Sequence, residues 1–235
     1  MPDTRFRVVT FNVLGTRFSQ TWDQRRNAVL SRLGHVLRRT APARASVYLL
    51  TECGADERSF LKANLPGSYL TWSRGAQTIL FDTAKWRHST VGSMDLGTTD
   101  YHGAVWAPLQ HLETDRTVVF CAFHLPPKGL VGQRFQKQRF RLLLSALDTF
   151  ATCVIGGDAN NRHAPRWARD FGLVSAIRAP QRVNHDRTTL DPFVVGAPID
   201  HLLGRGISWR SYLNQDAGSA SDHQMVTARA TAPAA

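Results

Sequence analysis

Short apolar runs alternate along the chain with amphipathic stretches. The runs are rich in β-branched and aromatic residues, which favours strands over helix fragments. We therefore expect strands over residues 8–11, 47–50, 78–81, 118–123 and 153–155.

Between these runs, apolar residues recur at helical spacing. This spacing predicts two long amphipathic helices, one containing residues 29–37 and one over 133–150, and shorter helices at 55–64 and 164–171. Thr21, followed three residues later by Gln24, forms a capping box that starts the first helix.

The order of the elements predicts a mixed α/β sandwich. Strands alternate with helices in the first half and hairpin-like strands occupy the middle, which argues against a purely parallel sheet. The polar segments 93–104 and 178–198 are expected to be loops. A chain of 235 residues can bury one large core, so we predict a single domain over 1–229 and a frayed tail over 230–235.

Polar residues of catalytic type stand at one end of six apolar runs or strand starts. In open α/β sheets, ligands collect where strand ends meet loops, so such residues converge in space although they are distant in sequence. An acidic, histidine-containing cleft is therefore expected, formed by Asn12, Glu52, His124, Asp158, Asn160, Asp200, Asp222 and His223.

Carboxylates gathered in one cleft repel one another unless a cation lies among them. Glu52, Asp158 and Asp222 supply oxygen ligands, and Asn12 adds a neutral one. This donor set favours Mg²⁺ or Mn²⁺ over Zn²⁺, which usually recruits Cys and several His.

The two histidines complete a set suited to phosphoester hydrolysis. Asp200 is available to fix the tautomer of His223, which could then take a proton from water or carry positive charge. His124 and Asn160 can donate hydrogen bonds to charge that develops in the transition state. His201 is expected to be a packing or supporting residue, because strand alternation points it away from Asp200.

Six short motifs, in chain order, resemble those of the endonuclease/exonuclease/phosphatase superfamily, which contains DNase I-like nucleases and abasic-site endonucleases. The resemblance spans residues 10–223 and implies a four-layer αββα sandwich, in which helices flank two mixed β-sheets. The motifs are Thr10-Phe11-Asn12-Val13, Leu50-Thr51-Glu52, Phe123-His124-Leu125, Gly157-Asp158-Ala159-Asn160, Ile199-Asp200-His201-Leu202 and Ser221-Asp222-His223.

The same resemblance implies a metal site and an in-line attack by water. Mg²⁺ would be held mainly by Glu52, with help from Asn12 and Asp222. Either Asp158 or His223 would be the general base, and both alternatives stay open.

The remaining implied roles concern the phosphate. His124 would contact the scissile phosphate, Asn160 would orient the nucleophile or phosphate, and Asp200 would support His223. The chain departs from the family pattern at Ala159, where an aromatic residue is common, and at Thr51, where Gln is frequent. Neither departure removes a ligand.

The charge of the chain favours a polyanionic substrate. Lys+Arg 29 against Asp+Glu 18 leaves a net charge of +11, and the sequence pI is about 10.5. Arg162, His163 and Arg166 follow Asn160 closely and are expected to bind a phosphate backbone, and Tyr101 and His102 are expected to border the cleft.

We therefore predict a Mg²⁺-dependent phosphodiesterase, with DNA as the expected substrate and endonuclease as the expected activity. The first alternative is a phosphatase of a small phosphorylated metabolite or phosphoinositide, because the fold does not fix the substrate. The second is a non-catalytic nucleic-acid-binding module, although such a module has no reason to retain mutually repelling carboxylates.

The expected environment is cytoplasmic. The first residues alternate charged and apolar side chains without the apolar core of a signal peptide, and no apolar run approaches the ~20 residues that span a bilayer. We expect a monomer without a membrane or an obligate protein partner. The three cysteines form no C-x-x-C pair and are expected to be reduced packing residues; they are Cys53, Cys121 and Cys153.

Overall fold

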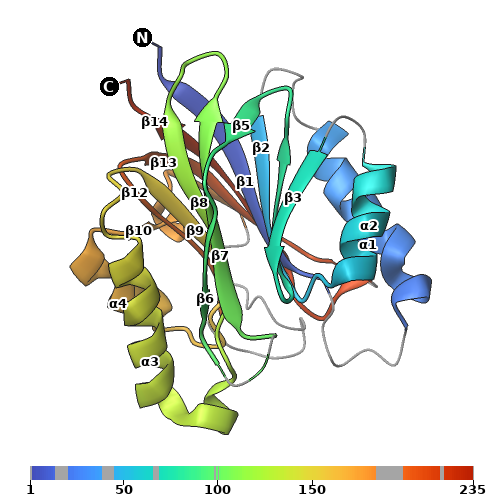
Figure 1. The fold of residues 1–235 in the computed structure, drawn as a ribbon, viewed down its shortest axis with the longest axis vertical. Helices are drawn as coiled ribbons and strands as arrows, with labels where there is room; N and C mark the ends of the chain where they lie inside the picture. Colours follow the sequence, from blue (N-terminus) through green and yellow to red (C-terminus); the bar gives the residue numbers. More distant parts are fainter. Residues whose placement is uncertain are drawn as a thin grey trace.

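Two seven-stranded β-sheets face each other, and helices cover the outer surface of each (Figure 1). This is the expected four-layer αββα sandwich. The computed structural model describes residues 2–13, 21–38, 45–65, 69–97, 99, 101–183, 198–217 and 220–234.

The first sheet has the strand order β11-β13-β14-β1-β2-β4-β3, and its middle pair, β1 and β2, is parallel. It consists of β1 (Thr4–Asn12), β2 (Ala45–Thr51), β3 (Tyr69–Arg74), β4 (Gln77–Asp82), β11 (Gln181–Val183), β13 (Ser208–Gln215) and β14 (Met225–Ala232).

The second sheet has the order β10-β12-β9-β8-β7-β5, and β6 also pairs with β7. Its parallel pair is β8 with β9. It consists of β5 (Trp86–His88), β6 (Gly92–Asp95), β7 (Gly103–His111), β8 (Thr117–His124), β9 (Cys153–Asp158), β10 (Val174–Ser175) and β12 (Asp200–Arg205).

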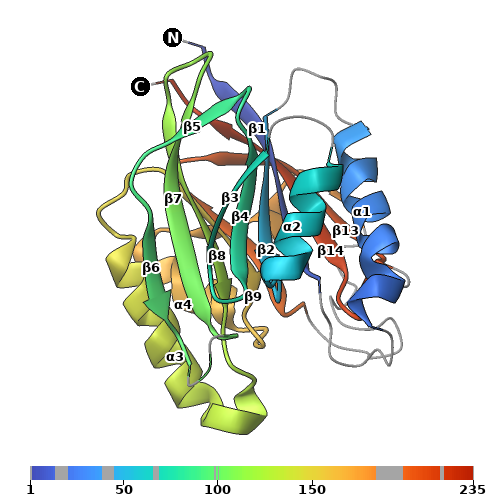
Figure 2. The same cartoon turned by 45° about the vertical axis from the view of Figure 1, so that its right-hand side comes forward.

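Two helices lie on each outer face. Figure 2 shows α1 (Trp22–Arg38) and α2 (Ala55–Asn64) along the first sheet, and α3 (Lys128–Ala146) with α4 (Ala164–Ala168) lies on the second. Single-turn 3-10 helices follow at η1 (Arg169–Phe171) and η2 (Ala176–Arg178). The backbone N–H of Thr21 donates to Gln24 Oε1 at 2.8 Å, as the capping box predicted.

Both faces of the central strands are buried, which explains their nearly continuous apolar runs. On β1, Phe6 and Val8 face the other sheet, and Val9 and Phe11 face the helices. Phe6 packs edge-to-face on Phe120 of β8, with ring centroids 5.4 Å apart, so aromatic contacts join the two sheets.

The structure corrects two boundaries. Segment 93–104 was predicted as a loop, but it contains most of β6 and the start of β7, which pair with each other. The frayed tail was wrong for residues 230–232, because these end β14 and pair with β1. The small side chains of Ala230 and Ala232 fit into the core between the sheets.

Two further expectations concern segments 133–150 and 178–198. The second long helix starts earlier than predicted, at Lys128, and has a kink at Gly132, where φ is +76°. Segment 178–198 contributes β11, and residues 184–197 lie outside the described part of the chain. Among the described helices, none is both long and apolar enough to cross a membrane.

Candidate active site

Strand ends from both sheets bring the predicted site residues to one edge of the sandwich. In the parallel pair β1–β2, Asn12 is opposite Thr51, which places Asn12 beside Glu52. Asn12 Nδ2 donates to Glu52 Oε1 at 2.9 Å and lies 3.4 Å from Asp158 Oδ2 of the second sheet. These hydrogen bonds tie the two sheets together at the predicted cleft.

Strand register in the second sheet brings three more residues together. In the parallel pair β8–β9, His124 is opposite Asp158, and in the antiparallel pair β9–β12, Asp200 is opposite Asp158. Adjacent strands lie about 4.8 Å apart, so both neighbours flank the Asp158 carboxylate.

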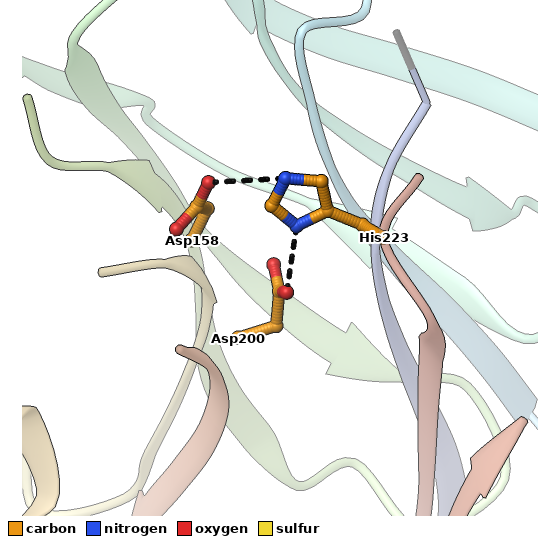
Figure 3. Close-up of side chains that lie close together, drawn as sticks. All are labelled: Asp158, Asp200 and His223. Atoms are coloured by element: carbon orange, nitrogen blue, oxygen red, sulfur yellow. Dashed lines mark hydrogen bonds and ion pairs between the residues drawn. The ribbon is translucent and has the colours of Figure 1, made fainter. Parts of the chain in front are cut away.

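His223 lies between two of these carboxylates (Figure 3). Its Nδ1 is 2.8 Å from Asp200 Oδ2, and its Nε2 is 3.8 Å from Asp158 Oδ2. Ser221 Oγ accepts a hydrogen bond from the His223 backbone N–H at 3.1 Å. The ring is thus held by Asp200, and its other nitrogen is directed toward Asp158.

Burial and charge shift the acid–base properties of this cluster. Burial opposes a charged imidazole, but the carboxylates of Asp200 and Asp158 outweigh it and raise the pKa of His223 to about 10. Burial and the neighbouring Asp200 charge raise the pKa of Asp158. The two acidic neighbours therefore favour the protonated form of the His223 ring.

His124 and Asn160 flank Asp158 on its other side. His124 Nε2 lies 3.5 Å from Asp158 Oδ2 and 3.2 Å from Asn160 Nδ2. Asn160 donates from its side chain to Leu125 O at 2.8 Å, and its backbone N–H donates to Asp158 Oδ1 at 2.7 Å. Both side chains can therefore reach an anion bound next to Asp158.

Unusual backbone geometry occurs at two of the predicted site residues. Glu52 has φ +52° and Asn160 has φ +47°, in the left-handed region that non-glycine residues rarely adopt. Each costs about 1–3 kcal/mol, a strain that is typically retained at functional sites.

The donor set fits a hard divalent cation. Glu52, Asn12 and Asp222 supply only oxygen ligands, and Asp222 Oδ1 is buried without a hydrogen-bond partner within the described residues. Asp158, Asp200 and His223 also lie within 4.8 Å of one another. His223 already lies between those two carboxyl groups, and Glu52, Asn12 and Asp222 are a second set of side chains that could hold the cation.

The expected rim residues lie in two places. The His102 ring lies against His124, with centroids 5.0 Å apart, and burial lowers the pKa of His102 to about 4. Tyr101 beside it is 54% exposed. Arg162, partly buried His163 and Arg166 lie beyond Asn160, at the start of α4 and along it, and both arginines are exposed.

Arg25 of α1 is a residue that the sequence analysis missed. It is 1% exposed, and its Nη1 donates to Val13 O at 3.0 Å and to Ala220 O at 2.8 Å. These carbonyls belong to the two segments that carry Asn12 and Asp222. Helical spacing could have indicated the burial of Arg25, because Arg25 precedes buried Val29 by four residues and so lies on the same apolar face of the helix.

A second missed group supports the loop after Asp158. Buried Gln136 of α3 donates to Pro126 O at 2.7 Å and accepts from Asn161 Nδ2 at 2.8 Å. His201 Nε2 donates to Asn161 O at 3.0 Å, and burial lowers the pKa of His201 to about 4, so the ring is neutral. His201 is thus a supporting residue, as alternation along β12 predicted.

Many solved structures share this fold, and three of them illustrate the likeness. An endonuclease/exonuclease/phosphatase family protein from Bacteroides thetaiotaomicron has a TM-score of 0.80 at 16% identity, over 98% of this chain and 99% of that chain. The mannosyl-6-phosphatase Bt3783 of the same organism has a TM-score of 0.77 at 16% identity, over 96% and 99%. D. rerio TDP2, complexed with single strand DNA product, has a TM-score of 0.75 at 16% identity, over 97% and 99%.

At these identities the structural likeness establishes the fold alone. A comparison with curated protein sequences found no match. The sequence model of the Endonuclease/Exonuclease/phosphatase family, however, matches residues 9–223, which include every motif residue of the cleft. Members of this family are metal-dependent phosphoesterases. With its motif residues assembled at one strand edge, the chain belongs to the Endonuclease/Exonuclease/phosphatase family and is a hydrolase of the phosphoesterase class.

Proposed function

We propose that the chain is a Mg²⁺- or Mn²⁺-dependent phosphodiesterase that cleaves DNA, acting as an endonuclease. The observation that carries the proposal is the continuity between the catalytic cluster and exposed cations. Asn160 contacts His124 within the cluster, and Arg162 and Arg166 extend from it along the protein surface. A substrate with phosphates on both sides of the scissile bond would use both features.

Asn12, Glu52 and Asp222 would hold the divalent cation. When bound, the cation supplies Lewis-acid polarisation of a phosphoryl oxygen and stabilisation of the leaving oxyanion.

Different side chains would accept the proton, stabilise the charge and orient the phosphate. Asp158, buried beside His124 and His223, is the general base that we favour for the attacking water. His223, held by Asp200 at 2.8 Å, carries positive charge toward the phosphoryl group. His124 and Asn160 orient the phosphate with hydrogen bonds.

The overall charge favours a nucleic acid over a small phosphorylated metabolite. A protein with a net charge of +11 can neutralise several backbone phosphates, whereas a monophosphate offers only one group for these cations. The fold also occurs in the mannosyl-6-phosphatase Bt3783, so a small-molecule phosphatase is the alternative that an experiment must separate.

A substrate panel tests the proposal directly. Supercoiled plasmid, single-stranded DNA, abasic duplex, RNA, mannose 6-phosphate and inositol phosphates would each be incubated with and without Mg²⁺ or Mn²⁺. Nicking of the circular plasmid, which has no ends, is the expected result. Turnover of the sugar phosphates without cleavage of DNA would overturn the proposal.

Three variants connect the activity to the cleft. We expect Glu52→Ala, Asp158→Ala and His223→Ala to lower cleavage by orders of magnitude. Asp23→Asn is the matched control, because Asp23 is an exposed carboxylate on α1 that pairs with Arg26 outside the cleft. Wild-type rates from the Glu52 and Asp158 variants would contradict the assignment.

A further inference from the structure

Four arginines line a groove beside α4, and two of them, Arg169 and Arg178, have no role assigned above. The groove has a volume of about 540 Å³, its lining includes buried Leu173 and Ser175, and none of the described residues that line it is acidic. The four arginines all have exposed side chains, and they are Arg162, Arg166, Arg169 and Arg178. This arginine groove gathers cations on one side of the catalytic cluster.

The arginines of the groove lack the acidic partners that some other surface arginines have. Arg26, Arg74 and Arg141 form ion pairs with Asp23, Asp95 and Asp170. Over the described part of the chain, no carboxylate lies within ion-pair distance of any arginine of the groove.

The acid closest in sequence to the groove does not neutralise it. Asp170, next to Arg169, instead lies 3.3 Å from Arg141 of α3. Like-charged guanidinium groups gathered without a counterion are unfavourable unless an anion binds them. The groove is thus built for a polyanion.

The arginines of the groove lie on separate elements around α4. Arg166 and Arg169 are three residues apart on α4 and its 3-10 extension, so they share one face. Arg162 lies in the turn before α4, and Arg178 ends η2 and also lines the groove.

We propose that this arginine groove binds the phosphodiester backbone of the nucleic-acid substrate on one side of the scissile phosphate. The inference rests on the proposed function, and it adds the path that the bound nucleic-acid strand takes over the protein surface. Arg162 lies two residues from Asn160, so the groove begins at the catalytic cluster and leads away from it. The planar guanidinium groups suit bidentate contacts with phosphate oxygens.

The experiment measures binding separately from cleavage. A fluorescein-labelled single-stranded DNA 12-mer is titrated by fluorescence anisotropy against Asp158→Asn protein over a range of NaCl concentrations. The test variant adds Arg169→Gln and Arg178→Gln. The matched control adds Arg26→Gln and Arg74→Gln, which remove the same net charge at ion-paired sites elsewhere.

We expect the test variant to bind about tenfold more weakly at ~0.1 M salt, and the slope of log K against log[NaCl] to become shallower by about 1.4. The control should keep both values close to those of the parent.

Equal losses in test and control variants would mean that overall charge alone acts, and would overturn the inference. Unchanged affinity in the test variant would also overturn it, even if the wild-type protein cleaves DNA. Groove-dependent binding in a protein whose wild type fails to cleave DNA would support the groove and contradict only the proposed function. Unchanged circular dichroism melting would show that both variants fold.

Discussion

The contact between β9 and β8 leaves no room for a side chain at Gly157. Gly157 is opposite Phe123 in the parallel pair, immediately before Asp158. A Cβ at this position would overlap the carbonyl oxygen and carbon of Phe123. Because the obstacle is backbone, no side-chain rotation can relieve it, and Gly157→Ala must push the two strands apart.

The size of the stability loss follows from the packing and hydrogen bonds that the separation of the strands disrupts. Overpacking a dense interior costs typically 1–3 kcal/mol, and we take about 2. Weakening two ladder hydrogen bonds adds about 2 kcal/mol at roughly 1 kcal/mol each. The expected loss in the free energy of unfolding is therefore about 4 kcal/mol, which for a domain of this size lowers Tm by roughly 8–16 °C.

Catalysis should fall as well, because Asp158 moves with its strand relative to His124. A misplacement of about 1 Å can cost roughly 100-fold in rate. Cleavage by the variant would be measured well below its Tm, so that unfolding does not contribute to the loss.

Thermal and urea unfolding followed by circular dichroism test the stability loss. Gly129→Ala is the matched control, since a Cβ at this exposed α3 position meets nothing within 4 Å. Its Tm should stay the same or rise, because alanine gains up to about 1 kcal/mol over glycine in a helix. A drop of less than ~2 °C for Gly157→Ala would refute the packing argument.

Four further outcomes are expected. EDTA should abolish hydrolysis and Mg²⁺ or Mn²⁺ should restore it; turnover that persists in the chelator would contradict a metal-dependent enzyme. Arg25→Met should lower the urea-measured stability by about 3 kcal/mol because two buried carbonyls lose their donor, and Arg25→Lys should lose less. Burial lowers the pKa of His201 to about 4, so the unfolded chain binds a proton there more readily than the folded protein, and acid destabilises the fold. Between about pH 7.5 and 5, the free energy of unfolding of the His201→Gln variant should therefore fall by about 2 kcal/mol less than that of wild type. Equal falls would count against this account. Burial raises the pKa of Cys53 to about 12 and also raises that of Cys121 and Cys153. A thiol reagent at about pH 8 should therefore label all three cysteines only after denaturation. Labelling of the native protein would contradict their burial.

Local patterns were sufficient for the helices, for the five strands that carry apolar runs and for most residues of the cleft. The apolar runs at 8–11 and 118–123 identified β1 and β8, because strands buried on both faces need continuous apolar side chains. Polar residues that interrupt these runs, such as Asn12 and His124, were recognisable because burial makes them costly without a function. The motif order along the chain was likewise sufficient for the family.

Long-range pairing decided what local patterns could not indicate. Ala230–Ala232 resembled a tail because small residues have weak strand preference, yet pairing with β1 makes them part of the core. Asn12 and Glu52 join Asp158 only because two sheets pack face to face, which no local signal encodes.

The sequence by itself determined the helices, the strands that carry continuous apolar runs and the chemical identity of the site residues, because these depend on side-chain type and short-range periodicity. Only the tertiary structure decided that Arg25 is buried against two carbonyls and that His223 lies between Asp200 and Asp158. The physical reason is that charge, burial and hydrogen-bond partners are properties of neighbours in space, and the neighbours of these side chains come from distant parts of the chain.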